Sequence, residues 1–271
     1  MKARRPSFFL NRMVRWRGAF TLTELLVVIA IVGVLVFLRL SALAGAKDQT
    51  KIAQCASNLR QLALTLHIYG NENADKLPAG LSGFWIWDLD GRAANVMFGG
   101  PDFQKFCYCP GTSFRFDDTD NFRLWWWASG GVPSTNIPLP RVIGYALALN
   151  NYPLIATNAN TSLQPQSVSF GPSIIPAQLP SQRVLVADAT ISLQSQHDYN
   201  QRYTYEYVNI TGGSYPKPHI SPHLKGKLPV GGNLGMLDGH VEWRKFENMT
   251  IRGYGGVSGA NDNGTCPTFW W

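Results

Sequence analysis

The chain has 271 residues, which is enough for one long helix and one globular head. Apolar residues make up 45% and charged residues 15%, a composition that excludes an intrinsically disordered chain. Of the net charge of +7, six charges belong to residues 1–19, which carry six basic side chains and no acidic one; the remainder has 18 basic against 17 acidic residues. Because the positive charge is confined to one tail, we expect no nucleic acid partner.

Residues 20–38, FTLTELLVVIAIVGVLVFL, contain one ionisable side chain, Glu24. As a helix this run is about 28 Å long, close to the thickness of a bilayer core. A basic tail before such a run is typical of the cytoplasmic end of a transmembrane helix. A secretory signal peptide, cut near the small residues at 41–46, is the alternative.

The following residues repeat at helical spacing. The apolar positions recur at steps of three and four: Ile52, Cys55, Leu59, Leu62, Leu66 and Tyr69. This pattern predicts an amphipathic helix whose apolar face packs against a sheet, with its end at Gly70 and Asn71. Residues 20–69 would then form one rod about 75 Å long.

The stretch RGAFTLTELLVVIAIVGVL (17–35) resembles the N-terminal motif of type IV prepilins and of the pseudopilins of type II secretion. In that family a basic leader is cut off, the new N-terminal residue is N-methylated, and a Glu occupies the fifth mature position. The resemblance places the cut between Ala19 and Phe20, with methylation on Phe20. A cut between Gly18 and Ala19 is the alternative, because the family usually has Gly before the cut.

Glu24 is the assembly residue that the resemblance implies. A carboxylate in an apolar helix is costly unless it is paired, and the free amine of Phe20 in a neighbouring subunit would pair with it and fix the register. Alternatively, Glu24 lies at headgroup level, where the helix dipole favours an anion.

The resemblance further implies a structural subunit of a filament, with no enzymatic activity and no cofactor. Its partners would be prepilin peptidase, further copies and other pseudopilins, and an inner-membrane assembly platform. The expected location is the bacterial inner membrane, single-pass, with the leader in the cytoplasm and the head in the periplasm. We favour a type II secretion pseudopilin; a surface type IV pilin and a membrane-tethered binding protein are the alternatives.

The predicted fold class is α+β: a long N-terminal helix, transmembrane in its first half and amphipathic in its second, packed on an antiparallel β-rich pilin-like head. The predicted segments are a leader (1–19), a membrane and filament-core helix (20–40), an amphipathic helix (41–70) and the head (71–271). Alternating apolar residues and turn signals predict strands at 84–89, 141–149, 183–190, 203–210 and 233–246. The last of these is a hairpin with Asp238-Gly239 at its turn.

Two stretches, 51–78 and 232–241, resemble a large-headed pseudopilin-like subfamily. In that subfamily a His precedes an Asp-Gly pair by nine residues. Here the corresponding residues are His223 and Asp238, at a longer spacing, and the implied role is structural.

Four cysteines, Cys55, Cys107, Cys109 and Cys266, follow the apolar run. A disulfide from Cys55 to Cys107 or Cys109 would tie the helix to the head, and Cys266 could take the other thiol; free buried thiols are equally compatible. Zinc is disfavoured because no CxxC spacing accompanies these thiols.

Other polar residues allow a metal or acid–base site, but a simpler interpretation is favoured for each. His219, His223, Asp238 and His240 are interpreted as residues of a turn with solvated histidines. Asp117, Asp118 and Asp120 are a weak calcium candidate, and a solvated turn is the alternative. Trp125, Trp126 and Trp127 are interpreted as a strand packed in the core or exposed to a partner, as is the pair Trp270 and Trp271.

Overall fold

The computed structural model describes residues 21–80, 85–134, 139–150, 160–164, 168–170, 173–175, 178–193, 195–196, 198–211, 215–253 and 267–271. The predicted cleavage site at Gly18, Ala19 and Phe20 lies outside the described residues, and so does Cys266. The chain divides into two compact units, Met1–Ala46 and Lys47–Trp271. The unit boundary falls inside the predicted amphipathic segment, so most of that segment belongs to the same unit as the head.

The first element, α1 (Leu22–Glu72), runs through the boundary between the two units. It ends where Ala74 and Asp75 take left-handed backbone conformations, with φ of 55° and 61°. The prediction put the end at Gly70, slightly too early. Gly70 does not end the helix; it leaves room for the side chain of Leu163, because a Cβ there would lie 2.7 Å from Cδ1 of Leu163.

The predicted architecture and location are wrong in one central respect. Within the described part of the chain, no helix is long and apolar enough to span a membrane. The transmembrane first half and the single-pass inner-membrane location are therefore withdrawn.

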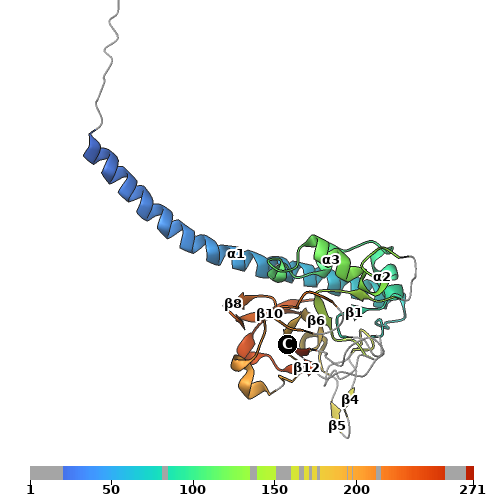
Figure 1. Cartoon of the computed structure of the whole chain (residues 1–271). Coiled ribbons are helices and arrows are strands. Elements are labelled where there is room, and N and C mark those ends of the chain that lie inside the picture. The colour runs from blue at the N-terminus through green and yellow to red at the C-terminus, as the bar shows by residue number, and fades with distance from the viewer. Residues whose placement is uncertain are drawn as a thin grey trace, which may run out of the picture. The chain divides into compact units, whose positions relative to one another are not determined.

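The second unit is built from several small antiparallel sheets and short helices, with its α-helices on one side of the strands (Figure 1). Its largest sheet has the strand order β11-β10-β6-β3. These strands are β3 (Tyr145–Leu147), β6 (Val184–Asp188), β10 (Gly231–Met236) and β11 (Val241–Lys245). A second sheet has the order β12-β13-β7, from β7 (Thr190–Ser192), β12 (Ile251–Gly253) and β13 (Thr268–Trp270).

The remaining elements are short. Three pairs of strands form the small sheets: β1 (Asp88–Leu89) with β2 (Arg141–Val142), β4 (Val168–Phe170) with β5 (Ser173–Ile175), and β8 (Leu224–Lys225) with β9 (Leu228–Pro229). The other α-helices are α2 (Gly91–Phe98) and α3 (Asp118–Trp125). The 3-10 turns are η1 (Lys105–Cys107), η2 (Pro110–Thr112), η3 (Trp127–Ser129), η4 (Pro180–Gln182), η5 (Tyr199–Thr204) and η6 (Phe246–Asn248).

Several predicted strands are present in part. The hairpin at 233–246 is confirmed as β10 and β11, with Gly239 at its turn in a positive-φ conformation of 89°. The run 141–149 yields β2 and β3, and the run 183–190 yields β6 and the start of β7. Of 84–89, only β1 is a strand.

Two predicted strands are wrong because local capping starts helical turns instead. Within 203–210 the first residues belong to η5, where the Asp198 side chain accepts a hydrogen bond from the N–H of Asn200. The tryptophan run does not form a strand, since Asp117 and Asp120 form a reciprocal capping box that starts α3. Trp125 is the last residue of that helix, and Trp127 begins η3.

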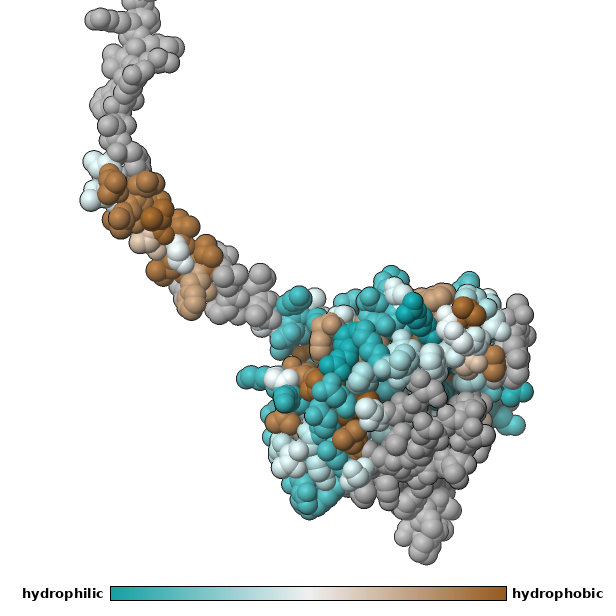
Figure 2. All heavy atoms as spheres, viewed as in Figure 1, coloured by the Kyte–Doolittle hydropathy of each residue, from teal (hydrophilic) through white to brown (hydrophobic). Residues whose placement is uncertain are grey.

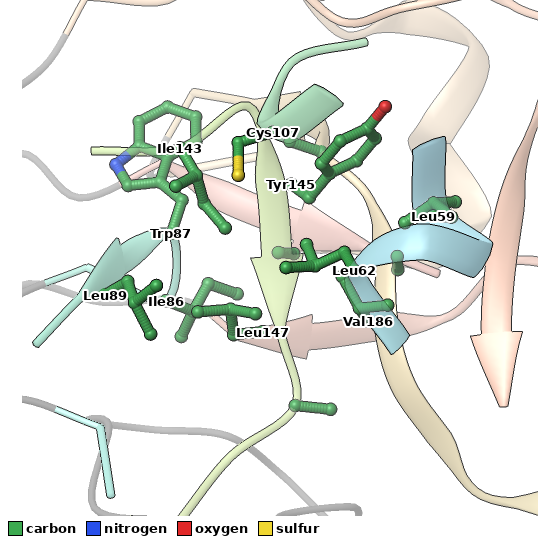
Figure 3. Close-up of a cluster of buried hydrophobic side chains, with 14 of the residues drawn as sticks. Leu59, Leu62, Ile86, Trp87, Leu89, Cys107, Ile143, Tyr145, Leu147 and Val186 are labelled. Atoms are coloured by element: carbon green, nitrogen blue, oxygen red, sulfur yellow. The ribbon is translucent and has the colours of Figure 1, made fainter. Parts of the chain in front are cut away.

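The core of the second unit forms where α1 packs against the four-stranded sheet. Leu59 and Leu62 are fully buried and lie beside Leu147 and Val186 of the sheet (Figure 3). Gly235 of β10 lies between the two layers, because a Cβ there would lie 2.9 Å from Cγ1 of Val186 on β6 and 3.7 Å, an ordinary van der Waals distance, from Cβ of Ala63 on α1. The predicted three-and-four spacing thus marks the side of α1 that is buried.

Leu62→Ala tests this packing, with Leu64→Ala as its control on the same helix. Leu62 is fully buried, whereas Leu64 is 58% exposed. We expect Leu62→Ala to lower the free energy of unfolding by about 3 kcal/mol through lost burial and a cavity. Leu64→Ala should change it by less than about 0.5 kcal/mol. Denaturant unfolding measures both, and equal effects would contradict the assigned helix face.

Candidate functional site

Four polar side chains from distant parts of the chain meet inside the second unit. They are Cys55 on α1, Cys109 just before η2, Asp188 at the end of β6 and His223 in the turn before β8. One ligand atom from each residue lies within 4.8 Å of the others, and all four residues are buried. No other such group of His, Cys, Asp or Glu occurs among the residues that the structure describes. We call these four residues the buried cluster.

Asp188 is the centre of the hydrogen bonding in the buried cluster. The Cys55 thiol donates to Oδ1 at 2.7 Å. The other carboxylate oxygen, Oδ2, accepts from the backbone N–H of Asn233 at 2.6 Å and from its side-chain amide at 3.2 Å. Nε2 of His223 lies 3.2 Å from the same oxygen. The Asn233 amide also donates to the carbonyl of Ile52 at 3.2 Å, so the network joins β6 and β10 to α1.

Cys109 is held against His223 by a tight turn. Its Sγ lies 3.3 Å from Nε2 of His223 and accepts the backbone N–H of Gly111 at 3.3 Å. A Cβ on Gly111 would lie 3.0 Å from both the backbone nitrogen of His223 and Cβ of Pro222, so the approach requires glycine. His223 itself takes a left-handed backbone conformation, with φ of 52°, which is uncommon outside glycine.

The electrostatics of the buried cluster follow from its burial. Burial disfavours the charged form of Asp188, but hydrogen bonds from His223, Cys55 and Asn233 hold the pKa of its carboxyl below the ordinary value. Burial also disfavours protonation of His223, yet Asp188 and Cys55 raise its pKa to about 10. Burial raises the pKa of Cys55 well above its usual range and that of Cys109 to about 11. At neutral pH the four side chains by themselves therefore form one ion pair and two neutral thiols.

Two thiol sulfurs, one imidazole and one carboxylate are the ligand types that proteins offer to borderline-soft divalent ions. No metal site was predicted at these residues from the sequence, because the four side chains stand at the distant positions 55, 109, 188 and 223. The predicted solvated histidines are also wrong for His219 and His223, which are 8% and 7% exposed. A spacing rule cannot detect ligands that only the tertiary fold brings together.

The other predicted polar residues have separate partners. Asp238 pairs with His240 across the hairpin turn, where both side chains are partly exposed, while His223 pairs with Asp188. Asp117, Asp118 and Asp120, the weak calcium candidate, lie at the start of α3. Asp117 caps the helix, Asp118 pairs with Lys105, and Asp120 pairs with Lys217.

The three described cysteines are free thiols. The predicted disulfide from Cys55 to Cys107 or Cys109 is not formed, and a bridge to Cys266 lies outside the described residues. Cys107 is fully buried but is not part of the buried cluster. Desolvation alone raises its pKa.

The tryptophans mostly serve the core. Trp125 is fully buried and donates its indole N–H to the carbonyl of Pro101. Trp126 is buried beneath the Arg141 guanidinium, which lies 4.1 Å from the ring centroid. Trp270 and Trp271 are fully buried as well.

Glu24 lies at the N-terminus of α1, in the first unit. Its carboxylate accepts hydrogen bonds from the backbone N–H and the hydroxyl of Thr21, both at 2.8 Å, and the Thr21 hydroxyl accepts the N–H of Glu24 at 3.2 Å. This is a capping box, which the spacing Thr-x-x-Glu could have revealed in the sequence. The Thr21 hydrogen bonds hold the pKa of Glu24 below its ordinary value.

The helix that follows Glu24 presents apolar side chains to solvent on all sides. Figure 2 shows one of these sides in brown. Its large apolar residues between Leu22 and Phe37 are each between 47% and 79% exposed. A helix that is hydrophobic all round is stable only when other apolar groups cover it.

Comparison of this chain with protein-family models, with curated proteins and with solved structures finds no match to any of them.

His219 is surrounded by aromatic side chains. It is four residues from His223 in the sequence but is not a member of the buried cluster. Its ring lies 4.8 Å from that of Trp87 and stacks on Phe116 at 5.9 Å and 10°, with Tyr215 at 6.1 Å. Burial lowers the pKa of His219 to about 4. Tyr215 stays neutral through this range, because the ordinary pKa of a tyrosine already lies well above it, and burial raises the pKa of Tyr215 further, to about 12.

The titration of His219 predicts a loss of stability in mild acid. In the unfolded chain, His219 binds a proton below pH ~6.5, whereas the folded protein resists protonation until about pH 4. Stability should therefore fall as the pH drops from about 6.5 to about 4, by roughly 3 kcal/mol in total. The difference in unfolding free energy between wild type and His219→Phe, measured across this range, isolates the effect. Parallel pH profiles for the two proteins would contradict it.

Proposed function

We propose that this chain is a structural subunit of a type IV pilus-like filament, and specifically a pseudopilin of a type II secretion system. In this proposal prepilin peptidase removes the leader, and the mature chain assembles with further copies and with other pseudopilins. The proposal rests on the sequence resemblance over residues 17–35 and on one structural observation, the exposed apolar surface of α1.

That observation favours assembly for a physical reason. The exposed side chains between Leu22 and Phe37 are unfavourable in water on every face of the helix. A bundle of identical helices removes this surface from water, because each copy supplies apolar neighbours to the next. The occupant of the surface is therefore a second copy of the same helix.

Glu24 is the assembly residue in this proposal. It is the one ionisable side chain between residues 21 and 37, so a helix bundle would bury its carboxylate among apolar groups. The α-amine exposed at Phe20 by cleavage supplies the matching cation from a neighbouring copy. A buried ion pair of this kind sets the register between helices better than apolar contacts do.

The capping box gives Glu24 a second role that an experiment must separate from assembly. Glutamine can occupy the same position of a capping box, so Glu24→Gln keeps the cap and removes the charge. We expect filament yield to fall at least about tenfold in Glu24→Gln, at unchanged protein level, because the buried amine loses its partner. The measurement is the amount of sheared filament from cells that carry the matching assembly machinery.

Thr21→Ala is the matched control. It removes the hydroxyl that accepts the Glu24 N–H but leaves the carboxylate available to a neighbour. We expect filaments in this variant at close to the wild-type amount. Wild-type yield from Glu24→Gln would overturn the assembly role, and loss of filaments in Thr21→Ala alone would assign Glu24 to helix capping.

A further inference from the structure

We propose that the buried cluster of Cys55, Cys109, Asp188 and His223 is a structural zinc site. The proposal concerns the second unit and is independent of filament assembly. It rests on the convergence of four ligand atoms, on their burial and on the packing that holds them together.

The positions of the ligand atoms fit a tetrahedral zinc ion. Zinc binds sulfur at about 2.3 Å, and histidine nitrogen and carboxylate oxygen at about 2.0–2.2 Å, so tetrahedral ligand atoms lie roughly 3.3–3.8 Å apart. Here Sγ of Cys109 lies 3.3 Å from Nε2 of His223, and this nitrogen lies 3.2 Å from Oδ2 of Asp188. Sγ of Cys55 lies 2.7 Å from Oδ1, the other oxygen of the same carboxylate. All four ligand atoms lie within 4.8 Å of one another, so separations of roughly 3.3–3.8 Å require each distance to change by about 1 Å or less.

The ligand set also selects the ion. Two thiolates and an imidazole favour zinc over calcium or magnesium, which prefer oxygen ligands. All four residues are at most 7% exposed, so the site is closed and supplies every ligand from the protein. Closed four-ligand sites are typical of structural zinc, whereas catalytic zinc keeps one position open.

The surroundings hold the ligands in place. The backbone N–H of Gly111 points at Sγ of Cys109, which stabilises a thiolate there. The backbone N–H and the side-chain amide of Asn233 both donate to the Asp188 carboxylate and hold it in place. The Tyr145 hydroxyl lies 3.5 Å from Sγ of Cys55. Hydrogen bonds of this kind orient metal ligands and tune their affinity.

Cys109 reaches the buried cluster from a separate turn. Asp188 already accepts from Cys55 on one oxygen and from Asn233 and His223 on the other. Cys109 adds a contact with His223, whose Nε2 lies 3.3 Å from its sulfur. Its sulfur lies within 4.8 Å of a ligand atom of each of the other three residues. A Cβ on Gly111 would lie only 3.0 Å from the backbone nitrogen of His223, so the turn that carries Cys109 is packed closely here. A fourth ligand explains this placement.

The test uses the reduced full chain in a mild detergent that covers the apolar residues of α1. After incubation with Zn²⁺ and removal of loosely bound ions, elemental mass spectrometry should find about one zinc per chain. Cys109→Ser should hold less than about a tenth of that amount. Cys107→Ser is the matched control: Cys107 is an equally buried free thiol outside the buried cluster, and this variant should retain the full amount.

A second measurement does not depend on how the variants fold. Wild-type protein loaded with Co²⁺ should show the intense visible bands of tetrahedral cobalt and a near-ultraviolet band from thiolate coordination. Folded wild type that takes up neither ion overturns the proposal. So does a Cys55–Cys109 disulfide in the protein as isolated, which non-reducing peptide mapping would reveal. Equal zinc loss in the Cys107 and Cys109 variants would also contradict the assignment.

Discussion

The second unit is organised around one buried charge, the carboxylate of Asp188. This side chain is 1% exposed, and an unpaired charge at such a depth would cost several kcal/mol. Its partners come from three separate parts of the chain: Cys55 on α1, His223 in the turn before β8, and Asn233 on β10. The requirement to match this charge fixes the positions of these elements relative to β6. If the four ligands hold zinc, the same constraint becomes stronger, because the ion binds all of them directly.

Small residues make room for this arrangement. A Cβ on Gly232 would lie 3.0 Å from Cβ of Asp188, so β10 approaches β6 closely beside the carboxylate. Gly111 plays the same part on the opposite side, where it admits the turn that carries Cys109. These two glycines belong to the packing of the polar site, and neither has a positive-φ requirement. Turn signals in the sequence did not predict that Gly111 and Gly232 are needed for close packing.

Parts of the fold were readable from the sequence because they depend on local patterns. The three-and-four spacing of apolar residues correctly predicted the buried face of α1, and the pair Asp238-Gly239 correctly predicted the turn of the hairpin of β10 and β11. The capping boxes at Thr21–Glu24 and Asp117–Asp120 were equally local but were not recognised; the second one converts the predicted tryptophan strand into the end of α3. The transmembrane span was wrong, and the predicted strand at 203–210 gave way to a 3-10 turn.

The buried cluster could not have been predicted in the same way. Its members are separated by 54, 79 and 35 residues along the chain, and no local pattern connects them. Cys55 was correctly placed on the buried face of the helix, but its hydrogen bond to the Asp188 carboxylate was not predicted. The cluster exists only once α1 and β6 are packed together. The resemblance over residues 51–78 and 232–241 singled out His223 with a structural role, but it named Asp238 and not Cys55, Cys109 or Asp188 beside it.

The central claim is that Asp188 and His223 depend on each other inside the fold. A double-mutant cycle with Asp188→Asn, His223→Gln and the combined variant tests it directly, by denaturant unfolding in the presence of a chelator that removes metal ions. We predict that each single change is strongly destabilising, and that the combined change costs at least about 2 kcal/mol less than the two single costs together. Additive costs would contradict the claim, because they would show that neither residue compensates the other.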